Sequence, residues 1–124
     1  MEFKIDTKET YTVIAPLDKH IGENMAAVLR QKCMSLEENG SQNFLIDMCD
    51  CVSADITSFT QLVALHEYCY TTGISLLFTN VNNAILNSMK EREVNELLNI
   101  TPTEIEAVDI ISMEILERDL FNEE

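Results

Sequence analysis

The sequence has few residues that break regular structure, and few positive charges. Its 124 residues include only 3 glycines, 2 prolines and no tryptophan. Only 8 lysines and arginines stand against 22 aspartates and glutamates, which gives a formal net charge of −14. Phosphate recognition depends on clustered Lys and Arg side chains, and the eight basic residues here are scattered. The composition therefore argues against nucleic acid and anionic membrane surfaces as partners.

Long apolar runs are missing as well. No stretch approaches the roughly 20 apolar residues that a transmembrane helix needs. The segment Met1–Asp6 lacks the charged-then-apolar layout of a signal peptide. We therefore expect a cytoplasmic protein, in which the 4 cysteines are thiols because that compartment is reducing. With 46% hydrophobic and 24% charged residues, the chain has the composition of one globular domain, which we expect to span residues 1–124.

The scarce glycines and prolines divide the chain into short segments. Strand-like composition in Phe3–Asp6 and Tyr11–Ala15 predicts an antiparallel hairpin around a polar turn. Helical spacing of apolar residues predicts helices over 24–38, 57–72 and 81–90, and a last helix that begins after Thr103 in a capping box. Short apolar runs predict strands at 44–48, 74–78 and 97–100. The segment 117–124 is expected to fray at the end of the chain.

This order of elements predicts an α/β fold in a single domain. Strands and helices alternate after the hairpin, so the sheet is expected to be mixed, mostly parallel, with four to five strands and about four helices. The strands Phe44–Met48 and Ile74–Phe78 are expected at its centre, because each is apolar apart from one residue, Asp47 or Ser75. The helices that start near Asn24 and Thr57 are expected to shield one face.

Several short motifs stand at particular places in this order. Leu17-Asp18 follows the second predicted strand, and Cys49-Asp50 follows the third. The run Asp55-Ile56-Thr57-Ser58 opens the second long helix, and Pro102-Thr103-Glu104-Ile105-Glu106-Ala107-Val108 opens the last. With these motifs in this order, the chain resembles a STAS domain, the fold of the bacterial anti-sigma factor antagonists, over roughly Phe3 to Leu116.

The resemblance implies a non-enzymatic regulator of transcription. In that family an Asp-Ser-Ser/Thr-Gly loop opens the second helix, and its third residue is phosphorylated by a kinase that is itself the anti-sigma factor. Here the third residue is Thr57, with Ser58 as the fallback acceptor. The implied partner surface consists of Asp18, Asp55, Ile56, Thr57 and Ser58, and the implied partner is an anti-sigma factor or kinase. The resemblance implies no cofactor and no small-molecule substrate.

Two departures from the family motif leave a second version of this function open. Ile56 replaces the first Ser, and Ser58 replaces the Gly that normally lets a partner approach the backbone. Ile56 has a second interpretation as an inward-turned core residue. Asp55 and Thr57 are also residue types that cap helices without any further role. The second hypothesis is therefore a degenerate STAS module that works as a constitutive adaptor.

A third hypothesis, of another class, is a thiol or metal-binding protein. Cys49 and Cys51 form a C-x-C pair whose side chains would point the same way at a strand end, and His66 and Cys69 lie on the next helix. A zinc site needs four ligands in suitable geometry. Cysteine more often packs as a small hydrophobe, and His66, on an apolar stripe, is more often a satisfied core residue. We therefore expect no bound metal and four free thiols.

Overall fold

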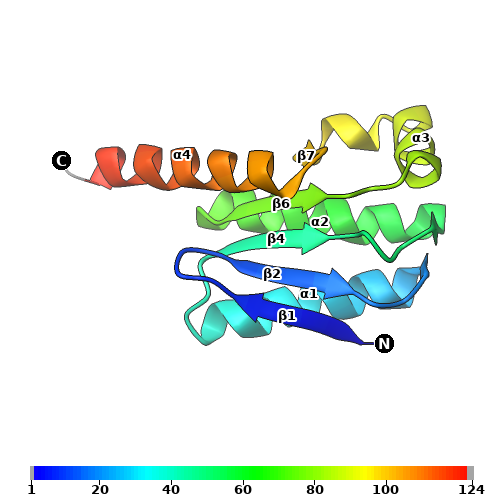
Figure 1. The fold of residues 1–124 in the computed structure, drawn as a ribbon, viewed down its shortest axis with the longest axis horizontal. Helices are drawn as coiled ribbons and strands as arrows, with labels where there is room; N and C mark the ends of the chain where they lie inside the picture. The colour runs from blue at the N-terminus through cyan, green and yellow to red at the C-terminus, as the bar shows by residue number, and fades with distance from the viewer. Residues whose placement is uncertain (1, 123–124) are drawn as a thin grey trace.

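The structure, a computed structural model, describes residues 2–122 and contains a five-stranded mixed sheet (Figure 1). The strands of this sheet are β1 (Phe3–Thr7), β2 (Thr12–Pro16), β4 (Asn43–Asp47), β6 (Ser75–Thr79) and β7 (Ile100–Thr101). They lie in the order β1-β2-β4-β6-β7. β1 and β2 form the predicted antiparallel hairpin, and all the other neighbouring pairs are parallel. The expectation of a mixed sheet with β4 and β6 inside it is confirmed.

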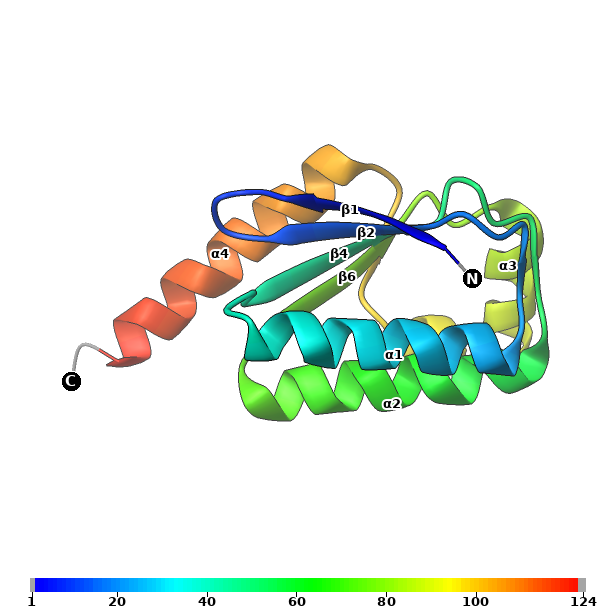
Figure 2. The same cartoon turned by 90° about the horizontal axis from the view of Figure 1, so that it is seen from below.

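The described residues form four α-helices, three of which cover the two faces of the sheet (Figure 2). The four are α1 (Glu23–Glu38), α2 (Ile56–Thr72), α3 (Asn83–Glu91) and α4 (Glu104–Asn122), and a short 3-10 helix, η1 (Val94–Glu96), follows α3. α1 and α2 lie side by side on one face, as the sequence predicted, and α4 crosses the other face, while α3 lies beyond the ends of the strands.

The core has two layers because successive strand residues point to opposite faces of the sheet. On the α1–α2 side, Phe44 and Phe78 pack into a large cluster with Leu62 of α2. On the α4 side, Leu45 and Leu77 pack against Ala107 and Ile111 of α4. Leu45 is 0% exposed and Leu62 is 1% exposed, so the predicted burial of both is confirmed.

Helix ends follow the local sequence. Gly73 ends α2 with a left-handed φ of 76°, which glycine adopts without steric strain. At the start of α4, the Thr103 hydroxyl oxygen accepts a hydrogen bond from the Glu106 backbone N–H (3.3 Å), as expected for an N-cap residue. These helix boundaries were predicted from the sequence alone.

Two boundaries differ from the sequence-based prediction. The strand expected over 97–100 is only the pair Ile100–Thr101, because the chain before it turns through Glu93 (φ 60°) into η1. The frayed tail expected from residue 117 is not found, since α4 remains helical to Asn122. Residues 123 and 124 of that expected tail lie outside the described residues.

A polar network holds the second half of α4 to the sheet and explains why the helix continues. Arg118 donates one hydrogen bond to the Ser75 hydroxyl oxygen (3.0 Å) and another to Asn43 Oδ1 (2.8 Å). The Ser75 hydroxyl donates to Glu114 Oε1 (2.6 Å). Asn43 also donates from Nδ2 to the Thr10 carbonyl (2.9 Å). The buried polar groups of Asn43 and Ser75 therefore depend on Arg118 for part of their hydrogen bonding.

Arg118→Ala is expected to lower the free energy of unfolding by about 1–3 kcal/mol. The substitution removes charge-assisted hydrogen bonds and leaves buried acceptors with fewer donors. Chemical denaturation measures the change. The matched control is Arg92→Ala, at an exposed arginine, where the expected change is within about 0.5 kcal/mol. Equal losses in the two variants would show that the network does not hold α4.

None of the helices within residues 2–122 combines the length and the apolar character needed to cross a lipid bilayer.

Candidate functional site

Two short strands bring the Asp18 and Asp55 segments together. They are β3 (His20–Ile21) and β5 (Ser53–Ala54), which pair in parallel as a separate two-stranded sheet. The Asp55 backbone N–H donates to the Ile21 carbonyl (2.8 Å), which places the start of α2 against the segment that follows β2. The surface of residues 18–22 and 55–58, the switch loop, is thus continuous, although its two segments lie far apart in the sequence.

The carboxylate of Asp55 faces His20 instead of capping α2. Asp55 is the N-cap residue of α2 with extended backbone angles, and its side chain makes no capping hydrogen bond. Asp55 Oδ1 lies 3.0 Å from His20 Nε2, and His20 Nδ1 lies 2.7 Å from the Ser53 hydroxyl oxygen. The backbone N–H groups of the first helical turn therefore donate no hydrogen bond to the Asp55 side chain, which leaves this helix end able to bind an anion.

Thr57 and Ser58 have opposite environments. Thr57, the second residue of α2, is exposed. Ser58 is fully buried, and its hydroxyl donates to the Asp55 carbonyl at 2.6 Å. Of the two candidate acceptors, Thr57 has the hydroxyl that an enzyme can reach without opening the helix start.

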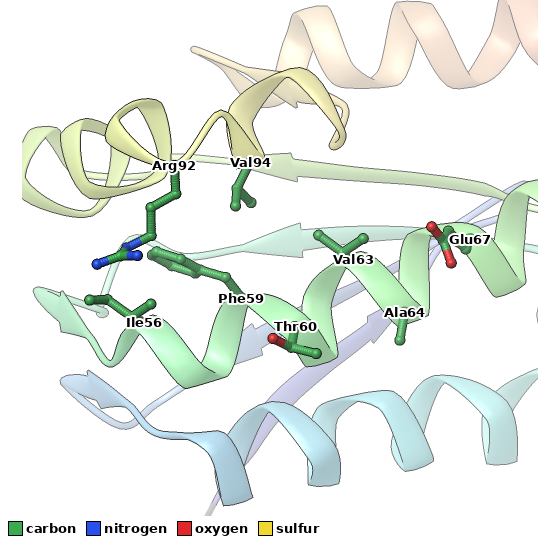
Figure 3. A pocket seen from close by; sticks show the side chains of 8 residues that line it. All are labelled: Ile56, Phe59, Thr60, Val63, Ala64, Glu67, Arg92 and Val94. Atoms are coloured by element: carbon green, nitrogen blue, oxygen red, sulfur yellow. The ribbon is translucent and has the colours of Figure 1, made fainter.

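A cavity of about 400 Å³ begins at the switch loop and follows the outer face of α2 (Figure 3). Ile56 lies at one end of it and is 47% exposed, so the interpretation of Ile56 as a core residue is wrong. The side chain of Arg92 extends toward Ile56 and Phe59, and Val94 forms part of the opposite wall. No sequence signal pointed to these wall residues, because their positions depend on how α3 and η1 pack against α2.

The cysteines do not form a common site. Cys33, Cys51 and Cys69 are buried and Cys49 is exposed, all as free thiols. The expectation that Cys49 and Cys51 point the same way is wrong. β4 ends at Asp47, and a turn closed by the Cys51 N–H and the Met48 carbonyl (3.0 Å) directs Cys51 into the core. Within residues 2–122, no three His, Cys, Asp or Glu side chains come together in a way that could hold a metal ion.

His66 differs from its expected role as a satisfied core residue. It is only partly buried, and its Nδ1 atom is shielded from solvent without a hydrogen-bond partner. Its ring lies 6.4 Å from that of Tyr70, centroid to centroid. His66 is thus a polar group at the edge of the core with one unused hydrogen-bonding atom.

The thiols are expected to react unequally with an alkylating reagent. Burial raises the pKa of Cys51 to about 11 and that of Cys69 to about 12, and it also raises the pKa of Cys33. The pKa of Cys49 is raised too, by partial burial and by the Asp47 and Asp50 carboxylates, but only Cys49 is exposed to a reagent. The thiolate is the reactive form, so the three buried thiols are both protonated and shielded at about pH 8. Mass spectrometry of the native protein should find label on Cys49 alone, and four labels after denaturation without reductant. Fewer than four labels in freshly prepared, denatured protein would revive the redox or metal hypothesis.

Comparisons with known proteins agree on the fold. TM1081 of Thermotoga maritima matches with a TM-score of 0.78 and 14% identity, over 89% of this chain and 94% of that chain. An anti-sigma-factor antagonist (STAS) domain protein from Planctomyces limnophilus matches with a TM-score of 0.73 and 15% identity, over 89% and 97%. No curated protein sequence matches this chain.

The anti-sigma factor antagonist SpoIIAA matches in two chemical states. Its unphosphorylated form has a TM-score of 0.70 and 12% identity, over 90% of this chain and 96% of that chain. Its phosphorylated form, described as a Bacillus cell fate determinant, has a TM-score of 0.62 and 11% identity, over 89% and 99%. At these identities the structural matches show a shared fold. The STAS domain family model matches residues 4–107, which is most of the chain. The chain therefore belongs to the STAS domain family.

Proposed function

We propose that this protein is a non-enzymatic regulator of the anti-sigma factor antagonist type, controlled by phosphorylation of Thr57. The observation that carries the proposal is the exposed Thr57 hydroxyl in the first turn of a helix whose N-cap carboxylate is engaged elsewhere. The protein is then the substrate of a kinase and has no catalytic residues of its own. In this proposal it acts in the cytoplasm to regulate transcription.

The start of α2 is electrostatically suited to a phosphate. Backbone N–H groups and the positive end of the helix dipole favour an anion there. The nearby carboxylate of Asp55 opposes it, and that carboxylate is paired with His20 at 3.0 Å. A phosphothreonine carries about −1.5 to −2 charges at neutral pH. Phosphorylation therefore changes the charge of the switch loop, and the start of α2 accommodates the phosphate without unfolding.

The proposed partner binds the switch loop and the cavity beside it. Asp18, Asp55 and Ile56 present two carboxylates and an exposed apolar side chain on one surface. The apolar walls of the adjoining cavity, including Phe59 and Val94, extend this surface along α2. An anti-sigma factor or kinase is the class of partner proposed, which agrees with the SpoIIAA structures in phosphorylated and unphosphorylated form.

One observation favours the constitutive adaptor as a second candidate. Ser58 occupies the place of the family's Gly, and its hydroxyl is committed to the Asp55 carbonyl inside the fold. A partner that once approached a glycine backbone meets a different surface here. In this version the switch loop and cavity bind a partner, and no phosphate is added.

The partner surface is tested with a purified anti-sigma factor kinase. Titration of the isotope-labelled chain should shift the amide signals of residues 18–22, 55–60 and 92–94. Phe121→Ser serves as the control, because its exposed side chain lies on the last turn of α4, away from the switch loop. Shifts confined to other surfaces would contradict the proposed interface.

A further inference from the structure

A second hollow lies at the other end of α2, between its last turns and the last turns of α4. In Figure 2 the C-terminal ends of both helices lie at the same end of the molecule, where the last turns of α4 run past the end of the sheet. The hollow has a volume of about 400 Å³, and its walls include His66, Tyr70, Ile74, Glu117 and Phe121. We call it the α2–α4 cleft. Tyr70 lies 13 residues along α2 from Thr57, which is about 20 Å at the rise of an α-helix.

The cleft exposes large aromatic side chains that the fold does not use. Tyr70 is 79% exposed and Phe121 is 82% exposed. A neighbouring hollow shares His66 and Tyr70 with the cleft and adds Leu97, which is 54% exposed. Single exposed apolar residues are ordinary, whereas several gathered around a hollow are typical of binding sites. Aromatic residues are also the type that most often dominates binding energy at protein interfaces.

The charges around these aromatic residues are acidic. Glu114 and Glu117 line the cleft, and Glu67 and Glu96 line the neighbouring hollow. Arg118 is the one basic residue on these walls, and its guanidinium donates to Ser75 and Asn43 of the sheet. An aromatic surface with an excess of carboxylates is complementary to an apolar segment that carries Lys or Arg, since ammonium and guanidinium groups also bind over aromatic faces.

His66 also lines this hollow, and its ring lies 6.4 Å from that of Tyr70, centroid to centroid.

We propose that the α2–α4 cleft is a docking site for a protein segment with a large apolar side chain next to Lys or Arg. It is separate from the switch loop and does not depend on phosphorylation. A second copy of this chain fits less well. Each copy has a net charge of −14, so a second copy would be repelled by the carboxylates around the cleft. The site gives the protein a second protein contact in addition to the one at Thr57.

Three fluorescent model peptides of about 18 residues, five helical turns, probe this proposal. One contains Leu and Lys in an amphipathic pattern, the second replaces Leu by Ser, and the third replaces Lys by Glu. Fluorescence anisotropy should show that the full-length chain binds the Leu–Lys peptide and neither of the others. Equal binding of the Ser–Lys peptide would mean that the acidic surface acts by charge alone, which would overturn the proposal.

Variants then locate the site. The double substitution Tyr70→Ser with Phe121→Ser should weaken binding of the Leu–Lys peptide by at least about tenfold, because it removes the aromatic anchors. Glu117→Gln should weaken binding at low salt and have little effect at about 1 M salt, where charge interactions are screened. Met113→Ser, at an exposed apolar residue outside the cleft, is the matched control and should leave the affinity unchanged.

Two results would overturn the assignment. Unchanged affinity in the double variant, or a loss as large in Met113→Ser, would place the peptide elsewhere. A dimer in sedimentation velocity that dissociates on the double substitution would assign the cleft to a second copy of the chain. All variants change exposed side chains, and circular dichroism checks that each remains folded.

Discussion

Leu45→Ala and Leu62→Ala are each expected to lower the free energy of unfolding by about 2–5 kcal/mol. Both side chains are essentially without solvent exposure, and truncation removes buried methyl groups and leaves a cavity. The two sites test separate layers, because Leu45 packs toward α4 and Leu62 belongs to the α1–α2 side of the core. Chemical denaturation of each variant measures the loss.

The control is the same chemical change at an exposed position of a helix. Leu116 lies on α4 and is 61% exposed, so Leu116→Ala should change stability by less than about 0.5 kcal/mol. A loss below about 1 kcal/mol at both buried sites would mean that the two-layer core is wrong. A small loss at Leu45 alone would mean that α4 does not pack firmly on the sheet.

Replacing Thr57 with Glu should weaken binding of the cognate anti-sigma factor or kinase by at least about tenfold, equal to about 1.4 kcal/mol. In the complex, the negative charge of Glu at position 57 would face an apolar or acidic partner surface, and such mismatches cost several kcal/mol. The same charge in the first turn of α2 favours the helix by about 0.3–1 kcal/mol. Binding should therefore fall while thermal stability stays equal or rises.

Thr57→Ala is expected to have the opposite effect on partner binding. Without the hydroxyl the chain cannot be phosphorylated at this position, so it should bind the partner as well as the unphosphorylated protein, even with ATP present. Thr7→Glu adds the same charge at an exposed threonine on β1 and should leave binding unchanged. Calorimetric titration compares the four proteins. Equal affinity of Thr57→Glu and Thr7→Glu would contradict a switch at the start of α2.

Much of the fold was predictable because local sequence and tertiary structure agree. The run Phe44–Met48 is apolar except for Asp47, which suits a strand covered on both faces, and β4 is such a strand. Gly73 and Thr103 mark a helix end and a helix start by their own chemistry. Signals of this kind require no knowledge of distant contacts.

The parts that were missed depend on contacts between distant segments. β3 and β5 have only two residues each, too few for a hydrophobic period, and they form by pairing with each other. The pairing of His20 with Asp55 follows from that contact. Arg118 was expected in a frayed tail, because its acceptors, Asn43 and Ser75, lie on strands far away in the sequence.

The candidate site was partly predictable for the same reason. The family resemblance gave Asp55 and Thr57 their place at a helix start, and the structure puts both there. It did not reveal that Ser58 faces inward or that Ile56 opens onto a cavity with Arg92. Side-chain direction in the first turn of a helix depends on what packs against it, which a single sequence does not record.

The proposed switch is phosphorylation of Thr57. It is tested by incubating the folded protein with its cognate kinase and ATP, followed by peptide mapping by mass spectrometry. We expect one phosphate per chain, on Thr57, and none in the Thr57→Ala variant. Phosphate found only outside Asp55–Ser58, or none with a kinase that is active on a related substrate, would contradict the proposed switch.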